Sequence, residues 1–107
     1  MPRRPKFTLT FAPETLGHLD AIEGKYHRLI RRTLDEQLCS TPEKATRNRK
    51  PLRQPAPFGA TWKLRFGPRN RFRVFYEVDV AEERVSVLAV GVKEGNRLFI
   101  GGEEFEP

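Results

Sequence analysis

The sequence predicts one α+β domain over residues 1–107, with its elements in the order β-α-α-β-β-β. A helical hairpin is expected to pack on one face of a mainly antiparallel four-stranded sheet. Three observations predict this fold. Four segments have the alternation or the apolar run of strands. A segment between the first two of them repeats apolar residues at helical spacing. The length of 107 residues suits a single domain.

The first strand is predicted over residues 6–11, where Phe7, Leu9 and Phe11 share one face. Pro13 ends this strand and suits the first turn of a helix.

Residues 14–38 are predicted to be helical, with a break at Gly24 between two helices. Before the break, Leu16, Leu19 and Ile22 are predicted to share a buried face. After it, the predicted buried face holds Tyr26, Leu29, Ile30, Thr33, Leu34, Gln37 and Leu38.

The second helix is expected to end at residues 40–42, with a short helical turn at about 42–47. Residues 48–60 hold three prolines and show no periodicity, so they are expected to form a surface loop. Binding groups concentrate on such loops.

The remaining three strands are predicted over residues 61–67, 71–79 and 84–92, with turns at 67–70 and 80–83. The last strand is an apolar run, which is typical of a central strand. The helical hairpin would return the first strand beside a later one. The tail from Lys93 to Pro107 holds a short apolar patch, Leu98-Phe99-Ile100, and then the residues GGEEFEP.

Composition excludes several classes of function. No stretch of about 18 apolar residues exists for a membrane helix, and the N-terminus lacks the apolar core of a secretory signal. Cys39 is the single cysteine, which excludes an intramolecular disulfide and a cysteine-rich zinc site. His18 and His27 lack metal-ligand spacing, and no glycine-rich phosphate loop is present. The expectation is a cytoplasmic protein without metal or cofactor.

Basic charge is concentrated in one part of the chain. The net charge is +6, but residues 39–73 hold ten basic residues against a single acidic one, Glu43. Such a block is a candidate footprint for a polyanion, and nucleic acid fits it better than a membrane surface. The alternative is a solvated basic loop.

Period-2 alternation places Lys63 and Arg65 on one face of a strand, and Arg73 can join them from the next strand. Like charges on neighbouring strands repel, and a bound phosphate would relieve this repulsion. Cations around a phosphate also stabilise a pentacovalent transition state. RNA supplies its own nucleophile, the 2′-hydroxyl, so such a site needs no metal. The alternative is an ordinary charged, solvent-facing sheet surface.

The segments TWKLRFGPRNRFRVFYEVD and RVSVLAVGVKEGNRLFI resemble the RelE/ParE toxin superfamily of type II toxin–antitoxin systems, and the RelE-like branch most closely. The resemblance implies a ribosome-dependent mRNA endoribonuclease that cleaves by metal-independent 2′-hydroxyl attack. Lys63 and Arg65 match its two basic strand residues, one of them a general base or phosphate ligand. Arg73 matches a transition-state phosphate ligand, and Lys93 a candidate general acid.

Phe99 stands where the family usually has a tyrosine that stacks on the substrate base. The C-terminal helix common in the family is replaced by an acidic tail with Glu103, Glu104 and Glu106, which could fold over the basic face. Phosphates of RNA are expected to contact a basic set consisting of Arg47, Arg49, Lys50, Arg53, Arg69 and Arg71.

The resemblance implies three partners, which are a cognate antitoxin, the ribosome and mRNA. Two alternatives remain open on the same fold. The first is a ParE-like gyrase inhibitor, and the second is a non-catalytic RNA-binding module.

Overall fold

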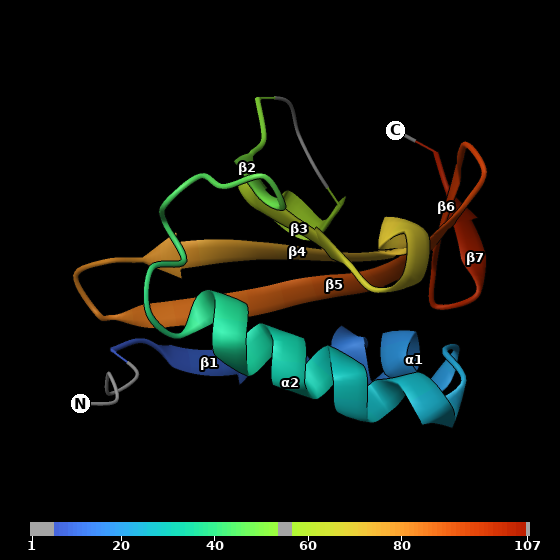
Figure 1. Ribbon diagram of the computed structural model, residues 1–107, viewed down its shortest axis with the longest axis horizontal. Coiled ribbons are helices and arrows are strands. Elements are labelled where there is room, and N and C mark those ends of the chain that lie inside the picture. The colour runs from blue at the N-terminus through green and yellow to red at the C-terminus, as the bar shows by residue number, and fades with distance from the viewer. Residues whose placement is uncertain (1–5, 54–56, 107) are drawn as a thin grey trace.

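The computed structural model describes residues 6–53 and 57–106, and places two helices against one face of a sheet (Figure 1). The helices and strands are β1 Thr8–Phe11, α1 Glu14–Asp20, α2 His27–Leu38, β2 Arg49–Pro51, β3 Trp62–Phe66, β4 Phe72–Asp79, β5 Arg84–Glu94, β6 Arg97–Ile100 and β7 Glu103–Phe105. Three short 3-10 turns are η1 Gly24–Tyr26, η2 Pro57–Gly59 and η3 Pro68–Asn70. Within the described residues, no helix is long and apolar enough to cross a membrane.

The strands form a single sheet in the order β2-β3-β4-β5-β6-β7, with antiparallel neighbours throughout this path. β5 is the central strand. β4 follows one of its edges, while β1 and β6 share the other edge (Figure 1). β1 runs parallel to β5, so the predicted return of the first strand beside a later one is confirmed.

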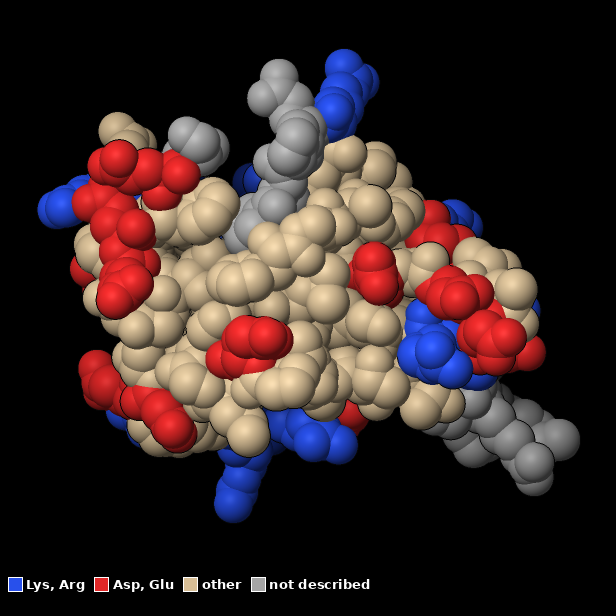
Figure 2. All heavy atoms as spheres, turned by 180° about the vertical axis from the view of Figure 1, so that it is seen from behind, with Lys and Arg blue, Asp and Glu red and all other residues tan. Residues whose placement is uncertain are grey.

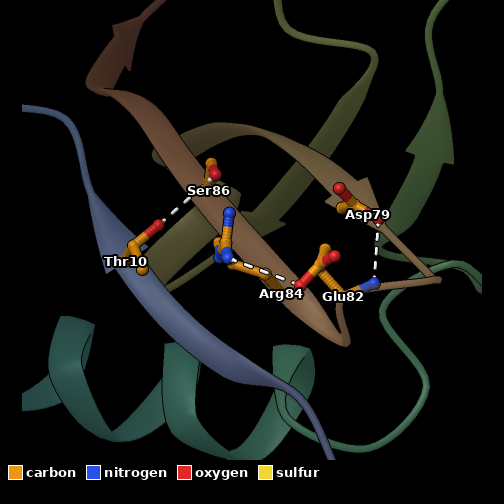
Figure 3. Close-up of polar contacts among 5 residues, drawn as sticks. All are labelled: Thr10, Asp79, Glu82, Arg84 and Ser86. Atoms are coloured by element: carbon orange, nitrogen blue, oxygen red, sulfur yellow. Dashed lines mark hydrogen bonds and ion pairs between the residues drawn. The ribbon is translucent and has the colours of Figure 1, made fainter.

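Polar side chains support the start of β5 (Figure 3). The Thr10 hydroxyl on β1 lies 3.3 Å from the Ser86 hydroxyl on β5. In the preceding turn, the Glu82 amide donates to Asp79 Oδ1 at 3.0 Å, and the Arg84 guanidinium lies 3.9 Å from the Glu82 carboxylate. The turn predicted at 80–83 is therefore held by its own side chains.

The predicted four-stranded sheet is an underestimate, because the described residues form seven strands. β2 lies inside the segment expected to be a loop, where it pairs with β3. β6 and β7 form a hairpin in the tail, closed by Gly101 and Gly102, which both have positive φ (65° and 82°). The helical turn expected at 42–47 is a hydrogen-bonded turn, with the Lys44 amide donating to the Thr41 carbonyl.

The main core lies between the helices and the sheet. Apolar residues of α2 pack there against the inward residues of β3, β4 and β5, at the positions that the alternation predicts. Tyr76 is fully buried in this core, and its hydroxyl donates to the Pro42 carbonyl at 3.1 Å. A smaller apolar cluster lies on the opposite sheet face and consists of Ala60, Phe75, Ala89 and Ile100.

The buried face of α1 differs from the prediction. Leu16 is 71% exposed, whereas Thr15 and His18 are buried. The Thr15 hydroxyl donates to the Ala12 carbonyl at 2.6 Å, and His18 Nδ1 accepts the Val90 amide proton at 3.2 Å. Because both polar groups are satisfied inside the fold, they replace the leucine there. β1 pairs with β5 as far as Val87, and β6 pairs with it from Gly91. His18 thus provides the hydrogen-bond acceptor for the Val90 amide between these two pairings.

Acid should weaken the fold through His18. Burial lowers the pKa of this imidazole below its ordinary value of 6.5, and Glu14 opposes the shift. The stability supplied by neutral His18 is therefore fully present above pH 6.5 and is lost as the pH falls below it. We expect a lower melting temperature at pH 5.5 than at pH 7.5. A His18→Gln variant, which keeps an acceptor but does not titrate, should show a smaller difference, and an unchanged difference would contradict this role.

Candidate functional site

Four basic side chains project from neighbouring strands on the sheet face away from the helices. Lys63 and Arg65 lie on β3, Arg73 on β4 and Lys93 on β5. Arg65 and Arg73 are directly opposite each other in the β3–β4 pairing. We call Lys63, Arg65, Arg73 and Lys93 the basic cluster. Figure 2, which shows the molecule from behind, is mostly uncharged on that side, with Lys and Arg side chains mainly toward its margins.

The electrostatics of Lys63 show that these charges converge. Partial burial lowers the pKa of its ammonium, and the positive charges of Arg73, Arg65, Lys93 and Lys50 lower it further. Lys50 was predicted to lie on a surface loop and to contact RNA phosphates. Its position on β2, opposite Lys63, adds it to the neighbourhood of the cluster. No periodicity around residue 50 could have revealed this strand.

Arg73 is the most enclosed member of the cluster, with 8% of its surface exposed. Its guanidinium donates to the carbonyls of Asn70 and Phe72. Burial lowers its pKa, and Arg65 lowers it further. Two directly opposed arginines repel each other, and a bound anion would relieve this repulsion.

A groove of about 520 Å³ lies beside Arg73 and Lys93, and we call it the basic groove. Its wall is the loop of η3, and its residues are Pro68, Arg69, Asn70, Arg71, Arg73, Lys93, Glu94 and Gly95. The Lys93 amide donates to the Arg71 carbonyl at 2.6 Å, which ties the end of β5 to this loop. Four basic residues, Arg69, Arg71, Arg73 and Lys93, therefore border a space open to solvent.

Two glycines set the backbone around Arg73. Gly67 has a φ of 84°, and a Cβ there would lie 2.4 Å from the Phe72 ring, so only glycine lets the η3 loop fold back. Gly91 pairs with Arg73 across the β4–β5 ladder. A Cβ on Gly91 would approach the Phe99 carbonyl oxygen to 2.9 Å, so its absence lets β6 pair closely.

Arg49 does not belong to a nucleic-acid surface, which corrects the prediction. The residue is 7% exposed. Its guanidinium donates to the Gln37 carbonyl near the end of α2 and lies 3.4 Å from the Thr41 hydroxyl. A guanidinium also satisfies the free carbonyls at a helix C-terminus, so its role here is structural.

Phe99 is separated from the basic cluster. It pairs with Val92, whose side chain packs against the helix-side core, whereas Lys93 projects from the other face. Alternation thus places Phe99 on the helix-bearing face of the sheet. Arg71 lies on that side too, with its guanidinium 5.5 Å from the ring centres of Tyr26 and Phe72. The structure does not bring the predicted base-stacking ring beside the predicted phosphate ligands.

The remaining basic residues of the predicted interface are exposed. Arg47, Lys50 and Arg53 extend from the β2 segment into solvent. The Arg65 guanidinium donates to the Arg47 carbonyl at 3.1 Å, which connects this segment to the basic cluster.

The acidic tail does not cover the basic face over its described residues. β7 pairs with β6 at the far edge of the sheet, and Glu104 accepts a hydrogen bond from Arg97 Nε at 3.0 Å. Glu104 therefore pairs with Arg97 of its own hairpin, which corrects the expectation of self-shielding.

Known proteins resemble this chain in structure. No family model matches this chain, and no curated protein matches its sequence. The structure is similar to a chain of the toxin–antitoxin complex RelBE2 from Mycobacterium tuberculosis, with a TM-score of 0.63 and 22% sequence identity. The match covers 84% of this chain and 100% of that chain. The chain thus has the RelE-like fold that its strand motifs predicted.

Proposed function

We propose that this chain is the toxin of a type II toxin–antitoxin system and a ribosome-dependent mRNA endoribonuclease. The observation that carries the proposal is the basic cluster, in which Arg65 and Arg73 oppose each other beside Lys63. The similarity to a chain of a toxin–antitoxin complex supports the same reading and suggests a cognate antitoxin as partner. The ribosome and mRNA would be met in the cytoplasm.

The proposed reaction is a transesterification that needs no metal. Lys63 in its neutral form takes the proton from the ribose 2′-hydroxyl, and the 2′-oxygen attacks phosphorus. Arg65 and Arg73 bind the phosphate oxygens as the pentacovalent transition state gains negative charge. The bond from phosphorus to the 5′-oxygen breaks, and Lys93 donates a proton to that oxygen. The products are a 2′,3′-cyclic phosphate and a 5′-hydroxyl.

The pH dependence of cleavage should depend on Arg65. The lowered pKa of Lys63 increases its neutral fraction near neutral pH. An Arg65→Gln variant removes one of the charges that lower this pKa, so the pKa of Lys63 should rise. We expect the rising limb of the single-turnover rate against pH to move to higher pH. Exposed Arg53 is not among the charges that act on Lys63, so an Arg53→Gln variant should keep the original profile.

The deciding experiment is primer extension on an mRNA translated in a reconstituted bacterial system with this protein added. Cleavage within the codon at the ribosomal A site supports the proposal. Uncut mRNA with normal translation would contradict it. Inhibition of DNA gyrase would then favour the ParE-like alternative, and salt-sensitive RNA binding without cleavage would favour a non-catalytic binding module.

A further inference from the structure

The outer side of β1 carries backbone groups that point away from the sheet. The amides of Thr8 and Ala12 donate to carbonyls at the β5 side, at 2.8 and 2.9 Å. Successive residues of a strand direct their backbone groups to opposite sides, so those of Leu9 and Phe11 face away from β5. Within the described residues, β5 is the only strand that pairs with β1 (Figure 1). We call the backbone groups of Leu9 and Phe11 the open edge.

The strands at the two ends of the sheet path are protected against further pairing. On β2, the Arg49 amide donates to the Thr46 hydroxyl at 3.0 Å, and the Arg49 carbonyl accepts the Thr46 amide proton at 2.8 Å. Pro51, the last residue of β2, has no amide proton to offer. β7 has three residues, and two of them are Glu103 and Glu104. Short length and charged side chains both discourage pairing at an edge, so β1 offers the free template.

The sequence of β1 is complementary to itself. Antiparallel pairing centred on Thr10 places Leu9 of each copy opposite Phe11 of the other. Opposed residues whose backbone groups face each other exchange both of their hydrogen bonds, and in β1 these are the residues of the open edge. The strand has no charged side chain, so a chain of net charge +6 can meet its copy here without opposing like charges. Thr10 then faces Thr10 of the second copy, a favourable cross-strand pair.

An apolar groove beside the open edge adds surface to this contact. The groove has a volume of about 390 Å³ and lies between α1 and α2, with Phe11, Leu16, Ile30 and Leu34 in its lining. Phe11 is 37% exposed and Leu16 is 71% exposed. In the antiparallel register, Leu9 of the second copy lies next to Phe11 at the rim of the groove. Pairing therefore also removes apolar surface from water.

The charges at the two ends of β1 have opposite signs. Lys6 precedes the strand and Glu14 begins α1 after it, and both are exposed. In an antiparallel pair, the start of one strand lies beside the end of the other. Lys6 of each copy is therefore directed toward Glu14 of the other. This charge complementarity favours a second copy as the occupant, because one chain supplies both halves of the match.

We propose that this chain forms a two-fold symmetric dimer through the open edge, with β1 of the two copies paired antiparallel around Thr10. Such an interface uses the same patch on both copies and closes on itself. Opposed residues of antiparallel strands point to the same face, so the basic clusters of the two copies lie on one side of a continuous sheet. The dimer goes beyond the proposed function, because no residue of the basic cluster takes part in it.

The test is sedimentation velocity of the full chain over a concentration series at low salt. The original chain should form a species of twice its mass as the concentration rises. Thr10→Lys and Thr10→Glu each place a like charge opposite itself. We expect each to raise the dissociation constant of the dimer at least about tenfold, which is about 1.4 kcal/mol of repulsion. An equimolar mixture of the two variants should restore the dimer, because unlike charges then face each other.

Further variants separate the contact from effects on the fold. Thr10 is exposed, so a charged side chain there should leave the core intact, which circular dichroism checks. Thr61→Lys makes the same substitution at an exposed threonine before β3, beyond β4 and β5 from β1, and should keep the dimer. Phe11→Pro removes an outward amide proton, which an edge strand tolerates, and should weaken the dimer without a change of charge.

The outcomes decide the proposal on its own. A chain that stays monomeric at its highest soluble concentration would overturn it. A dimer that the Thr10 variants and Phe11→Pro leave unchanged would overturn it too, as would folded Thr10 variants whose mixture remains monomeric. Because RNA cleavage is measured in none of these experiments, loss of the dimer leaves the endoribonuclease proposal standing, and absence of cleavage leaves the dimer standing.

Discussion

An Arg73→Ala variant should lose cleavage at the ribosomal A site by roughly 100- to 1,000-fold, the usual effect of removing one preorganised group that binds transition-state charge. Arg73 is enclosed and is oriented by the Asn70 and Phe72 carbonyls, so its guanidinium is held in a fixed position. Single-turnover primer extension on programmed ribosomes measures the loss.

The fold should survive this change. Alanine removes one of two opposed positive charges, and this relief offsets part of the lost hydrogen bonding. An Arg84→Ala variant provides the control, because Arg84 is an arginine at the distant end of β5 with 49% of its side chain exposed. It should cleave normally. Full cleavage by a folded Arg73→Ala variant would exclude Arg73 from the mechanism.

A Gly67→Ala variant should be destabilised by about 2–5 kcal/mol, because two penalties act together. A φ of 84° with ψ at −177° is backbone that only glycine adopts without strain. The new methyl group would also lie 2.4 Å from the Phe72 ring, which is fully buried and has no room to retreat. Chemical denaturation monitored by circular dichroism gives the free energy of unfolding.

Gly95→Ala separates the strain from the clash. Gly95 also has a positive φ, of 62°, but a Cβ there meets nothing within 4 Å. We expect a loss of about 1–2 kcal/mol, the cost of the backbone conformation alone. Equal losses in the two variants would show that the contact with Phe72 contributes nothing. In the folded fraction, Gly67→Ala should also cleave more slowly, since the loop that orients Arg73 is displaced.

The sequence predicted those elements in which the spacing of apolar residues reflects which side chains are buried. Alternation in β3 and β4 and the apolar run of β5 identified the centre of the sheet, because the buried face of each strand is continuous there. β2 was not predicted because it is an edge strand of three residues. Its one buried residue, Arg49, is held by polar contacts rather than by apolar packing. The β6–β7 hairpin was not predicted although Gly101 and Gly102 are a hairpin-turn signal, because its strands have only four and three residues and show no clear alternation.

The candidate site was predictable to the same extent. The alternation of side chains along the two strands predicts that Lys63, Arg65 and Arg73 lie on one face of the sheet. The register of the β3–β4 pairing agrees with this. The place of Phe99 depends on how β6 pairs with β5, and no local pattern contains that register. The burial of His18 was not predicted, because the helical spacing of apolar residues favours leucine for the buried face. The Val90 amide has no strand partner there and needs an acceptor, which His18 supplies.

The parallel pairing of β1 with β5 also concerns how the protein is made. Thr10 meets Ser86, a residue synthesised 76 positions later. At elongation speeds of about 5–20 residues per second, the first strand waits several seconds or longer for its partner. A nascent chain that ends before residue 84 contains β1, β3 and β4 but lacks β5, the strand with which β1 pairs. The pairing of β1 is thus postponed until most of the polypeptide has been synthesised, and a partly made chain lacks one edge of its central strand until then.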